Sequence, residues 1–197
     1  MRAPQEYEIA ALDFSGTEYT VEQTGTDKNF RPEYEARDVT GETLFHCTHQ
    51  MYESNDRFPF VDDDGTELFT VEASGKWDIA GDYLLTDSQT GEELVILDND
   101  FSLFQDTWRI RDAEDESLLA EISSRGALYT VARKLLPVGQ WIGHKFEVTD
   151  AEGNSVGTIE SGFAVFDKYE ITISDRSSVP LAPIVAGTVV IDGIQGN

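Results

Sequence analysis

One short pattern recurs five times along this chain and constrains its fold more than any other feature. Each copy has alternating apolar residues, an aspartate, a glycine three or four positions later, and an apolar residue three positions beyond. The copies are YEARDVTGETL, FVDDDGTEL, YLLTDSQTGEEL, FEVTDAEGNSV and WRIRDAEDESL, the last with Asp115 in the glycine position. Aspartate initiates turns by accepting hydrogen bonds from backbone N–H groups, and glycine adopts the positive φ of tight turns. Each copy therefore predicts a β-hairpin.

The spacing of the copies predicts how the hairpins assemble. The leading aspartates of the first four lie 24 or 25 residues apart, and the whole series is Asp38, Asp62, Asp87, Asp112 and Asp150. Two strands in about 25 residues are too few for a propeller blade, which needs roughly 40 residues. They fit a meandering antiparallel sheet that closes on itself. We expect a mostly β protein, a closed antiparallel barrel of about 12 strands between Tyr34 and Ser174.

The pattern also divides the chain into two parts. Residues 1–33 hold no copy, so we expect an N-terminal extension there, with YEIAALDF and TEYTVEQT as candidates for an outer hairpin. Residues 34–197 form the barrel domain, because no linker or change of composition interrupts them.

The end of the chain, VPLAPIVAGTVVIDGI, carries no charge from Ser177 to Ile191. Its β-branched residues favour a strand. Pro180 and Pro183 favour a helix that starts after Ser177 or Ser178 as its cap, and a segment apolar on all sides is typical of a buried helix. Fifteen uncharged residues with two prolines fall short of the roughly 20 that a membrane span needs. The residues alone leave strand and helix both open, and predict no transmembrane segment.

The chain resembles the LURP-one-related proteins, whose fold is shared with the C-terminal domain of Tubby and with phospholipid scramblases. The resemblance covers Tyr34 to the end and lies in the hairpins, in WRIRDAEDESLLAEI with KFEVTDAEGNSVGTIE, in FDKYEITI, and in PLAPIVAGTVVIDGI. It implies a twelve-stranded barrel with a hydrophobic C-terminal helix through its axis, at about residues 180–194. It also implies a binding role, since Tubby-like domains bind phosphoinositide headgroups through basic side chains.

The net charge of −24 is dispersed along the chain, with 38 acidic and 14 basic residues. Dispersed acid with few lysines is typical of a protein adapted to a salt-rich cytoplasm, which indicates a halophilic, haloarchaeal source. Such a surface repels phosphates and excludes nucleic acid as a partner. A single cysteine, Cys47, and an N-terminus without an apolar signal region indicate a cytoplasmic protein, with peripheral membrane contact as an option.

No pattern in the sequence indicates an enzyme, a metal site or a cofactor. The stretch HCTH places Cys47 and His49 on one face of a strand, but two ligands are fewer than the three or four that zinc requires. The acidic stretches DDDGTE and DNDFSLFQD lack the glycine and glutamate positions of a calcium loop. No nucleophile elbow, phosphate loop or dinucleotide fingerprint is present. We therefore predict a non-catalytic protein with no cofactor and no metal.

One segment departs from the acidic composition. From Ile122 to Phe146 there is no acidic residue, and the segment supplies five candidate ligand-binding residues: Arg125, Arg133, Lys134, Trp141 and Lys145. Bases beside apolar side chains favour contact with an anionic lipid headgroup or a membrane surface. The alternatives are a protein partner or self-association through the same patch, and an inner strand over Ala127–Leu136 whose bases complete local ion pairs. The function predicted is a binding module.

Overall fold

The computed structural model describes residues 2–51, 56–74, 82–101, 106–124, 145–162 and 167–195. A short 3₁₀ helix, η1 (Pro4–Tyr7), precedes the first strand, and a helix, α2 (Leu181–Gln195), ends the chain. Between them lie the strands β1 (Glu18–Thr26), β2 (Pro32–Asp38), β3 (Thr43–Thr48), β4 (Arg57–Val61), β5 (Glu67–Ala73), β6 (Asp82–Asp87), β7 (Glu93–Phe101), β8 (Asp106–Asp112), β9 (Leu118–Ser124), β10 (Lys145–Asp150), β11 (Ser155–Gly162) and β12 (Lys168–Ile173).

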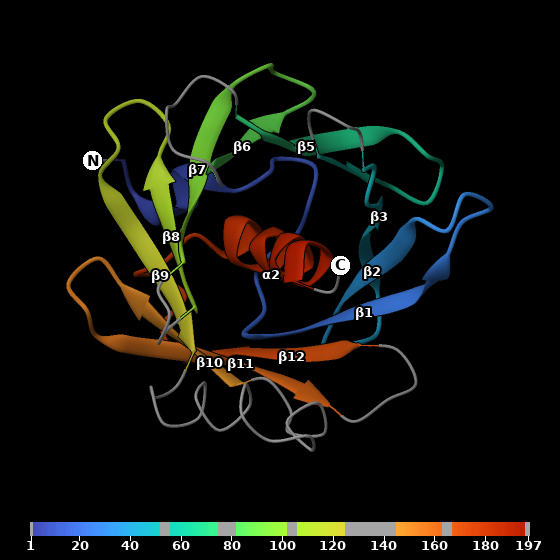
Figure 1. Ribbon diagram of the computed structural model, residues 1–197. Helices are drawn as coiled ribbons and strands as arrows, with labels where there is room; N and C mark the ends of the chain where they lie inside the picture. The colour runs from blue at the N-terminus through green and yellow to red at the C-terminus, as the bar shows by residue number, and fades with distance from the viewer. Residues whose placement is uncertain are drawn as a thin grey trace.

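The strands form one closed barrel in which each pairs antiparallel with its neighbours along the chain. Pairing of β1 with β12, with Tyr19 opposite Ile171, closes the ring (Figure 1). The predicted barrel of about 12 antiparallel strands is confirmed. Its first strand lies earlier than expected, because β1 falls in the stretch 1–33 for which the sequence suggested an outer hairpin. There β1 pairs with β2 as well as β12, so it is a strand of the barrel wall.

The aspartate turns have the structure that the repeat predicts. In the second copy, Oδ1 of Asp62 accepts hydrogen bonds from the backbone N–H groups of Asp64 (3.0 Å) and Thr66 (2.8 Å). The backbone N–H of Gly65, at φ 82°, donates to the carbonyl of Asp62 at 3.0 Å. The copy that begins at Asp112 differs from the prediction, because Glu116 and not Asp115 takes the glycine position, with φ 58°. There the turn is one residue longer than at Asp62, and the N–H of Glu116 donates to the carbonyl of Asp112.

Antiparallel pairing places alternate links at opposite ends of the barrel. The five aspartate turns, residues 39–42, 62–66, 88–92, 113–117 and 151–154, lie at one end, which we name the turn end. At the other end, which we name the connection end, lie the strand ends that flank the links 27–31, 49–56, 74–81, 102–105, 125–144 and 163–167.

Helix α2 occupies the interior of the barrel, with strands around it (Figure 1). Its side chains from Leu181 to Ile191 are buried on every side, as a uniformly apolar helix requires. Gly187 lies where an added Cβ would meet Leu97 at 3.8 Å and Ile122 at 3.9 Å. The predicted C-terminal helix at about residues 180–194 is confirmed. Among the described residues, no helix is long and apolar enough to cross a membrane.

The first turn of α2 is capped by a residue from the opposite end of the sequence. The carboxylate of Glu8 accepts hydrogen bonds from the backbone N–H groups of Leu181 (2.7 Å) and Ala182 (2.9 Å). The predicted cap at Ser177 or Ser178 is wrong, because the hydroxyl of Ser178 donates to the Asp175 carbonyl instead. A carboxylate at this position satisfies two free N–H groups and opposes the positive end of the helix dipole.

Candidate functional site

The two ends of the barrel differ in the residues that their links carry. Every aspartate turn at the turn end contains acidic residues, and none of the five contains a basic or aromatic residue. Each of the six links at the connection end contains an aromatic residue, and three of them contain lysine or arginine. Aromatic side chains and arginine are the types that interfaces favour. The connection end is therefore the candidate functional site.

The C-terminal end of α2 is fixed at this end by a buried carboxylate. Asp192 accepts hydrogen bonds from the hydroxyl of Tyr34 on β2 at 2.9 Å and from that of Tyr169 on β12 at 2.6 Å. Burial raises the pKa of Asp192, although the two hydroxyl groups act in the opposite direction. Burial and the adjacent carboxylate raise the pKa of both tyrosines, so both remain donors. The group joins α2 to two strands of the wall.

The ring of His49 packs beside the same end of α2. It stacks on Phe58 with 4.1 Å between ring centroids, and a Cβ added at Gly193 would lie 2.8 Å from Phe58. Nε2 of His49 is 3.4 Å from Oδ1 of Asp56, an ion-pair distance without the alignment of a hydrogen bond. Burial lowers the pKa of His49, more than the proximity of Asp56 raises it. The imidazole is therefore neutral at pH 7.

Other buried polar atoms near this end have no hydrogen-bond partner among the residues described. They are Oγ of Ser74, Oδ1 of Asp82 on β6, Nε1 of Trp108 on β8, and the side-chain amide of Asn99, which lies opposite Trp108 on β7. Tyr83 lies between Trp108 and Phe58, at centroid distances of 6.1 and 6.3 Å. A buried polar atom without a protein partner is a position where water binds. The interior at the connection end is thus more polar than the aliphatic middle of the barrel.

The described part of the chain includes one of the five candidate ligand-binding residues. Lys145, the first residue of β10, forms an ion pair with Glu160 on β11. The other four, Arg125, Arg133, Lys134 and Trp141, lie outside the described residues, as does the proposed inner strand over Ala127–Leu136. The flanking residues Ile122 and Phe146 are buried in the barrel core. Sequence reasoning did not anticipate that Lys145 already has an anionic partner.

The stretch HCTH alternates between the two faces of β3 as a strand must. His46 is half-exposed and its Nε2 lies 2.9 Å from Oδ1 of Asp63, whereas Cys47 and His49 are buried. Burial raises the pKa of the Cys47 thiol far above its ordinary value. In the ranges that the structure describes, no group of three or more His, Cys, Asp or Glu side chains is arranged to hold a metal ion.

The two acidic stretches have structural partners. In DDDGTE, the Asp62 carboxylate holds its own turn through the two N–H groups described above. In DNDFSLFQD, Oδ2 of Asp98 on β7 lies 3.2 Å from Nε of Arg111 on β8. These carboxylates therefore stabilise a turn and a cross-strand ion pair.

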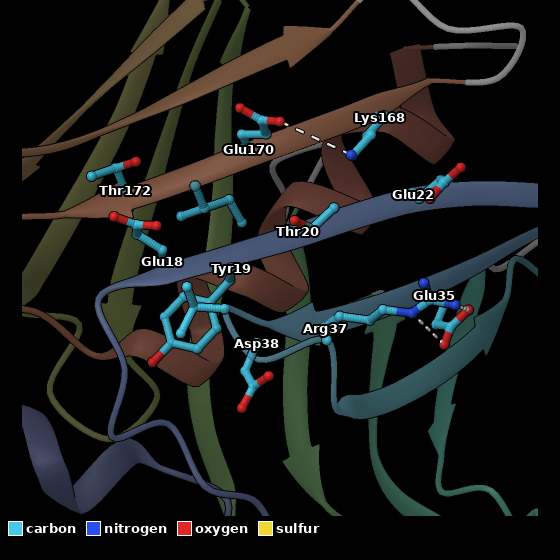
Figure 2. A pocket seen from close by; sticks show the side chains of 13 residues that line it. Glu18, Tyr19, Thr20, Glu22, Glu35, Arg37, Asp38, Lys168, Glu170 and Thr172 are labelled. Atoms are coloured by element: carbon cyan, nitrogen blue, oxygen red, sulfur yellow. Dashed lines mark hydrogen bonds and ion pairs between the residues drawn. The ribbon is translucent and has the colours of Figure 1, made fainter.

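A shallow groove of about 420 Å³ crosses the outer face of β12, β1 and β2 (Figure 2). Its cations are both paired: Arg37 binds Glu35 through two hydrogen bonds of 2.8 and 2.9 Å, and Lys168 lies 4.0 Å from Glu170. Further carboxylates of Glu18, Glu22 and Asp38 line the same groove. An anion would have to displace a carboxylate from one of these cations, so the groove does not suit an anionic ligand.

Few large apolar side chains are exposed on the described surface. Phe30 (84% exposed) and Met51 (43%) lie in links at the connection end, and Val39 (66%) lies in the first aspartate turn. Sequence reasoning missed Phe30. The available signal was an aromatic residue inside TDKNFRP, a stretch otherwise made of turn-forming and charged residues.

Comparison with known families agrees with the fold. The family model described as LURP-one-related matches residues 43–192, which is most of the chain. This chain belongs to the LURP-one-related family. An X-ray structure of an Arabidopsis thaliana protein is similar to it, with a TM-score of 0.53 and 13% sequence identity over 95% of this chain and 99% of that one. At this identity the likeness concerns the fold alone. No curated protein matches the sequence.

In this LURP-one-related chain, the matched range includes the ten strands β3 to β12 and α2 almost to its end. The strands β1 and β2 precede residue 43 and complete the barrel wall. Family membership together with the barrel fold suggests a binding-type domain.

Proposed function

We propose that this protein is a non-catalytic binding module whose connection end contacts an anionic headgroup at a membrane surface. The acid-free segment 122–146 supplies the contacts, through the bases Arg125, Arg133 and Lys134 and through Trp141. Lys145 contributes least, because its ammonium group already pairs with Glu160.

The observation that carries the proposal is the difference between the two ends of the barrel. The links at the turn end are acidic throughout, and the links at the connection end combine aromatic residues with the longest acid-free stretch of the chain. A basic patch attracts anionic lipid, and aromatic side chains favour the interfacial layer of a bilayer. The five links at the turn end contain neither basic nor aromatic residues.

The length of the link between β9 and β10 also supports the proposal. Phe146 lies opposite Ser124, so the two strands meet as in a hairpin. A hairpin needs two to five residues, roughly, whereas residues 125–144 provide twenty. A long link between adjacent strands is a common position for binding residues.

The resemblance of the sequence to Tubby-like domains and scramblases supports an anionic lipid as the ligand, at the level of the fold alone. We further propose a cytoplasmic protein that reaches the membrane peripherally. If its cytoplasm is rich in salt, as the dispersed acidic charge suggests, the Debye length falls to about 3 Å near 1 M salt. Only direct contacts would then hold the headgroup.

The test is co-sedimentation with phosphatidylcholine vesicles that contain or lack phosphatidylserine or a phosphoinositide. Wild type should pellet with the anionic vesicles, and R133E/K134E should stay in the supernatant. A double substitution near the turn end, R37E/R176E, makes the same charge change and should leave binding unaltered. A soluble inositol phosphate added as competitor distinguishes a free anion from a headgroup at a surface. Equal pelleting of wild type and R133E/K134E would overturn the proposal.

A second candidate function uses the same segment. Leu135, Leu136 and Trp141 would suit a protein partner or a second copy of the chain, because interface cores favour aromatic and aliphatic residues. Size-exclusion chromatography separates the two candidates. A dimer that Trp141→Ala abolishes, from a protein that ignores vesicles, would favour self-association.

A further inference from the structure

Phe30 is held in a conformation that its side chain does not favour. It lies in the link 27–31, with φ 61° and 84% of its surface exposed. Left-handed backbone is common for glycine and asparagine, and for a bulky aromatic residue it is an outlier. Burial of the phenyl ring does not explain the position, since the ring is the most exposed large apolar side chain described. A strained residue that the surroundings maintain is a reason to look for a function.

Hydrogen bonds within the link 27–31 maintain the left-handed backbone of Phe30. The N–H of Phe30 donates to the carbonyl of Asp27 at 3.0 Å, and the N–H of Asp27 donates to the carbonyl of Arg31 at 2.9 Å. Oδ1 of Asp27 accepts from the N–H groups of Asn29 (2.8 Å) and Arg31 (3.0 Å). Oδ2 of Asp27 binds the Arg31 guanidinium at 2.6 and 2.9 Å. These hydrogen bonds fix the backbone conformation of the link in the unbound protein.

The position of Phe30 on the barrel indicates its partner. Its link is at the connection end. The backbone N–H of His49, the first residue of the next link, donates to the carbonyl of Pro32, the residue that follows the link of Phe30. The same next link contains the exposed Met51. Lys28 is exposed and forms no ion pair with any described residue. Phe30 therefore shares its link with a cation that pairs with no described residue, and the link holds no other large apolar side chain. A protein interface requires a contiguous apolar patch, whereas a bilayer accepts isolated aromatic tips with cations at the phosphate level.

We propose that Phe30 inserts into the interfacial layer of a lipid bilayer and that the barrel meets the membrane end-on, with its connection end toward the lipid. This inference rests on the proposed function and adds an orientation and an apolar anchor to it. The preset backbone lowers the ordering required on binding. Because apolar contact is not screened by ions, Phe30 contributes at high salt, where the bases lose their long-range attraction.

The test uses the full chain and Phe30→Asn, because asparagine tolerates the left-handed backbone and removes the ring. The variant should fold at least as stably as wild type, so loss of binding cannot be attributed to unfolding. Val39→Asn removes an exposed apolar side chain at the turn end and serves as the matched control. Vesicles of phosphatidylcholine and phosphatidylserine are sedimented with each protein at ~0.1 M and ~1 M salt, where the Debye lengths are about 10 and 3 Å.

We expect Phe30→Asn to weaken vesicle binding about tenfold at both salt concentrations, Phe30→Trp to retain it, and Val39→Asn to change nothing. R133E/K134E should lose binding mainly at low salt. Binding that survives in Phe30→Asn but not in R133E/K134E overturns the anchor and leaves the proposed function standing. The reverse result supports the anchor and overturns the basic segment. Wild type that ignores vesicles overturns both, and a dimer that depends on Phe30 would then assign the loop to a protein contact.

Discussion

The turn end and the connection end of this barrel are built on different principles. At the turn end, each link is four or five residues long and an aspartate organises it. The N-terminal segment adds to this order, because the hydroxyl of Tyr7 donates to Asp112 at 2.5 Å and the Arg2 guanidinium binds Glu92 and Glu114. At the connection end, the links vary from four to twenty residues and carry the aromatic side chains.

The contrast between the turn end and the connection end indicates which parts of a closed barrel provide stability and which are available for binding. A barrel has no free sheet edges, so its ends are the places where backbone and side chains can vary. Here one end is fixed by turns, by η1 and by Glu8 on the helix. The other end retains buried polar atoms with no hydrogen-bond partner among the described residues, at Asn99 and Trp108, and the strained, exposed Phe30. We expect ligand contact to depend on the second end, whereas stability depends on both, because α2 is fixed by Glu8 at one end and by Asp192 at the other.

The largest expected effect comes from α2 where it meets the connection end. A Cβ at Gly193 would lie 2.8 Å from Cε1 of the buried Phe58 ring, so Gly193→Ala should lower the free energy of unfolding by about 2 kcal/mol. At Gly187 the same change meets only ordinary contacts of 3.8 and 3.9 Å. There alanine should stabilise the helix, by up to about 1 kcal/mol. Urea unfolding of both variants measures the contrast, and equal effects would contradict the packing described here.

Removal of the helix cap tests the turn end. Glu8→Ala should lower the free energy of unfolding by about 1–2 kcal/mol, because two N–H groups of α2 lose their acceptor. Glu8→Gln should lose less, since one amide oxygen can still accept. Ser178→Ala, at the cap that the sequence suggested, should be nearly neutral. A larger loss for Ser178→Ala than for Glu8→Ala would refute the assignment of the cap.

The pH dependence of stability should have opposite signs at the two ends. Burial raises the pKa of Asp192, so the fold favours its protonated form, and wild type should gain stability relative to Asp192→Asn as pH falls from neutral toward about 4. The hydroxyl and N–H groups of Thr40 and neighbouring N–H groups lower the pKa of Asp38, so the fold favours its charged form. Wild type should therefore lose stability relative to Asp38→Asn as pH falls below about 4. Denaturant midpoints measured from pH 7 to pH 3 report both signs, and slopes of the same sign would contradict the account.

The smallest expected effect concerns the turn 113–117, the fourth of the five aspartate turns. Glu116 occupies a left-handed position that glycine fills in the other turns, so Glu116→Gly should raise the free energy of unfolding by about 0.5–1 kcal/mol. Gly91→Ala, at the matching position of the third turn, should lower it by a similar amount. Thermal unfolding of the two variants should shift the midpoint in opposite directions. Shifts in the same direction would show that the positive φ does not control these turns.

Much of the fold was predictable because its signals are local. An aspartate and a glycine define a hairpin within five residues, and a run of uncharged residues defines the buried helix. β1 escaped the prediction because the turn that joins it to β2 departs from the repeat: Asp27 organises the turn, but Phe30 takes the left-handed position in place of glycine. The cap at Glu8 escaped it because acceptor and donors are separated by 173 residues in sequence.

The candidate site was predictable only in part. Composition identified the acid-free segment, but it could not show that Glu160 would lie beside Lys145, since that contact depends on the register of β10 and β11. Nor could it show that the links with aromatic residues all meet at one end of the barrel, because that depends on the alternation of antiparallel strands around a closed ring.

Hydrogen–deuterium exchange of the wild-type protein, with and without vesicles of phosphatidylcholine and phosphatidylserine, tests the difference between the ends most directly. The account predicts that vesicles slow exchange in peptides that contain the links 27–31 and 125–144 and leave the turns 39–42 and 151–154 unchanged. Slower exchange at the aspartate turns, or vesicle binding without any change at the connection end, would contradict it.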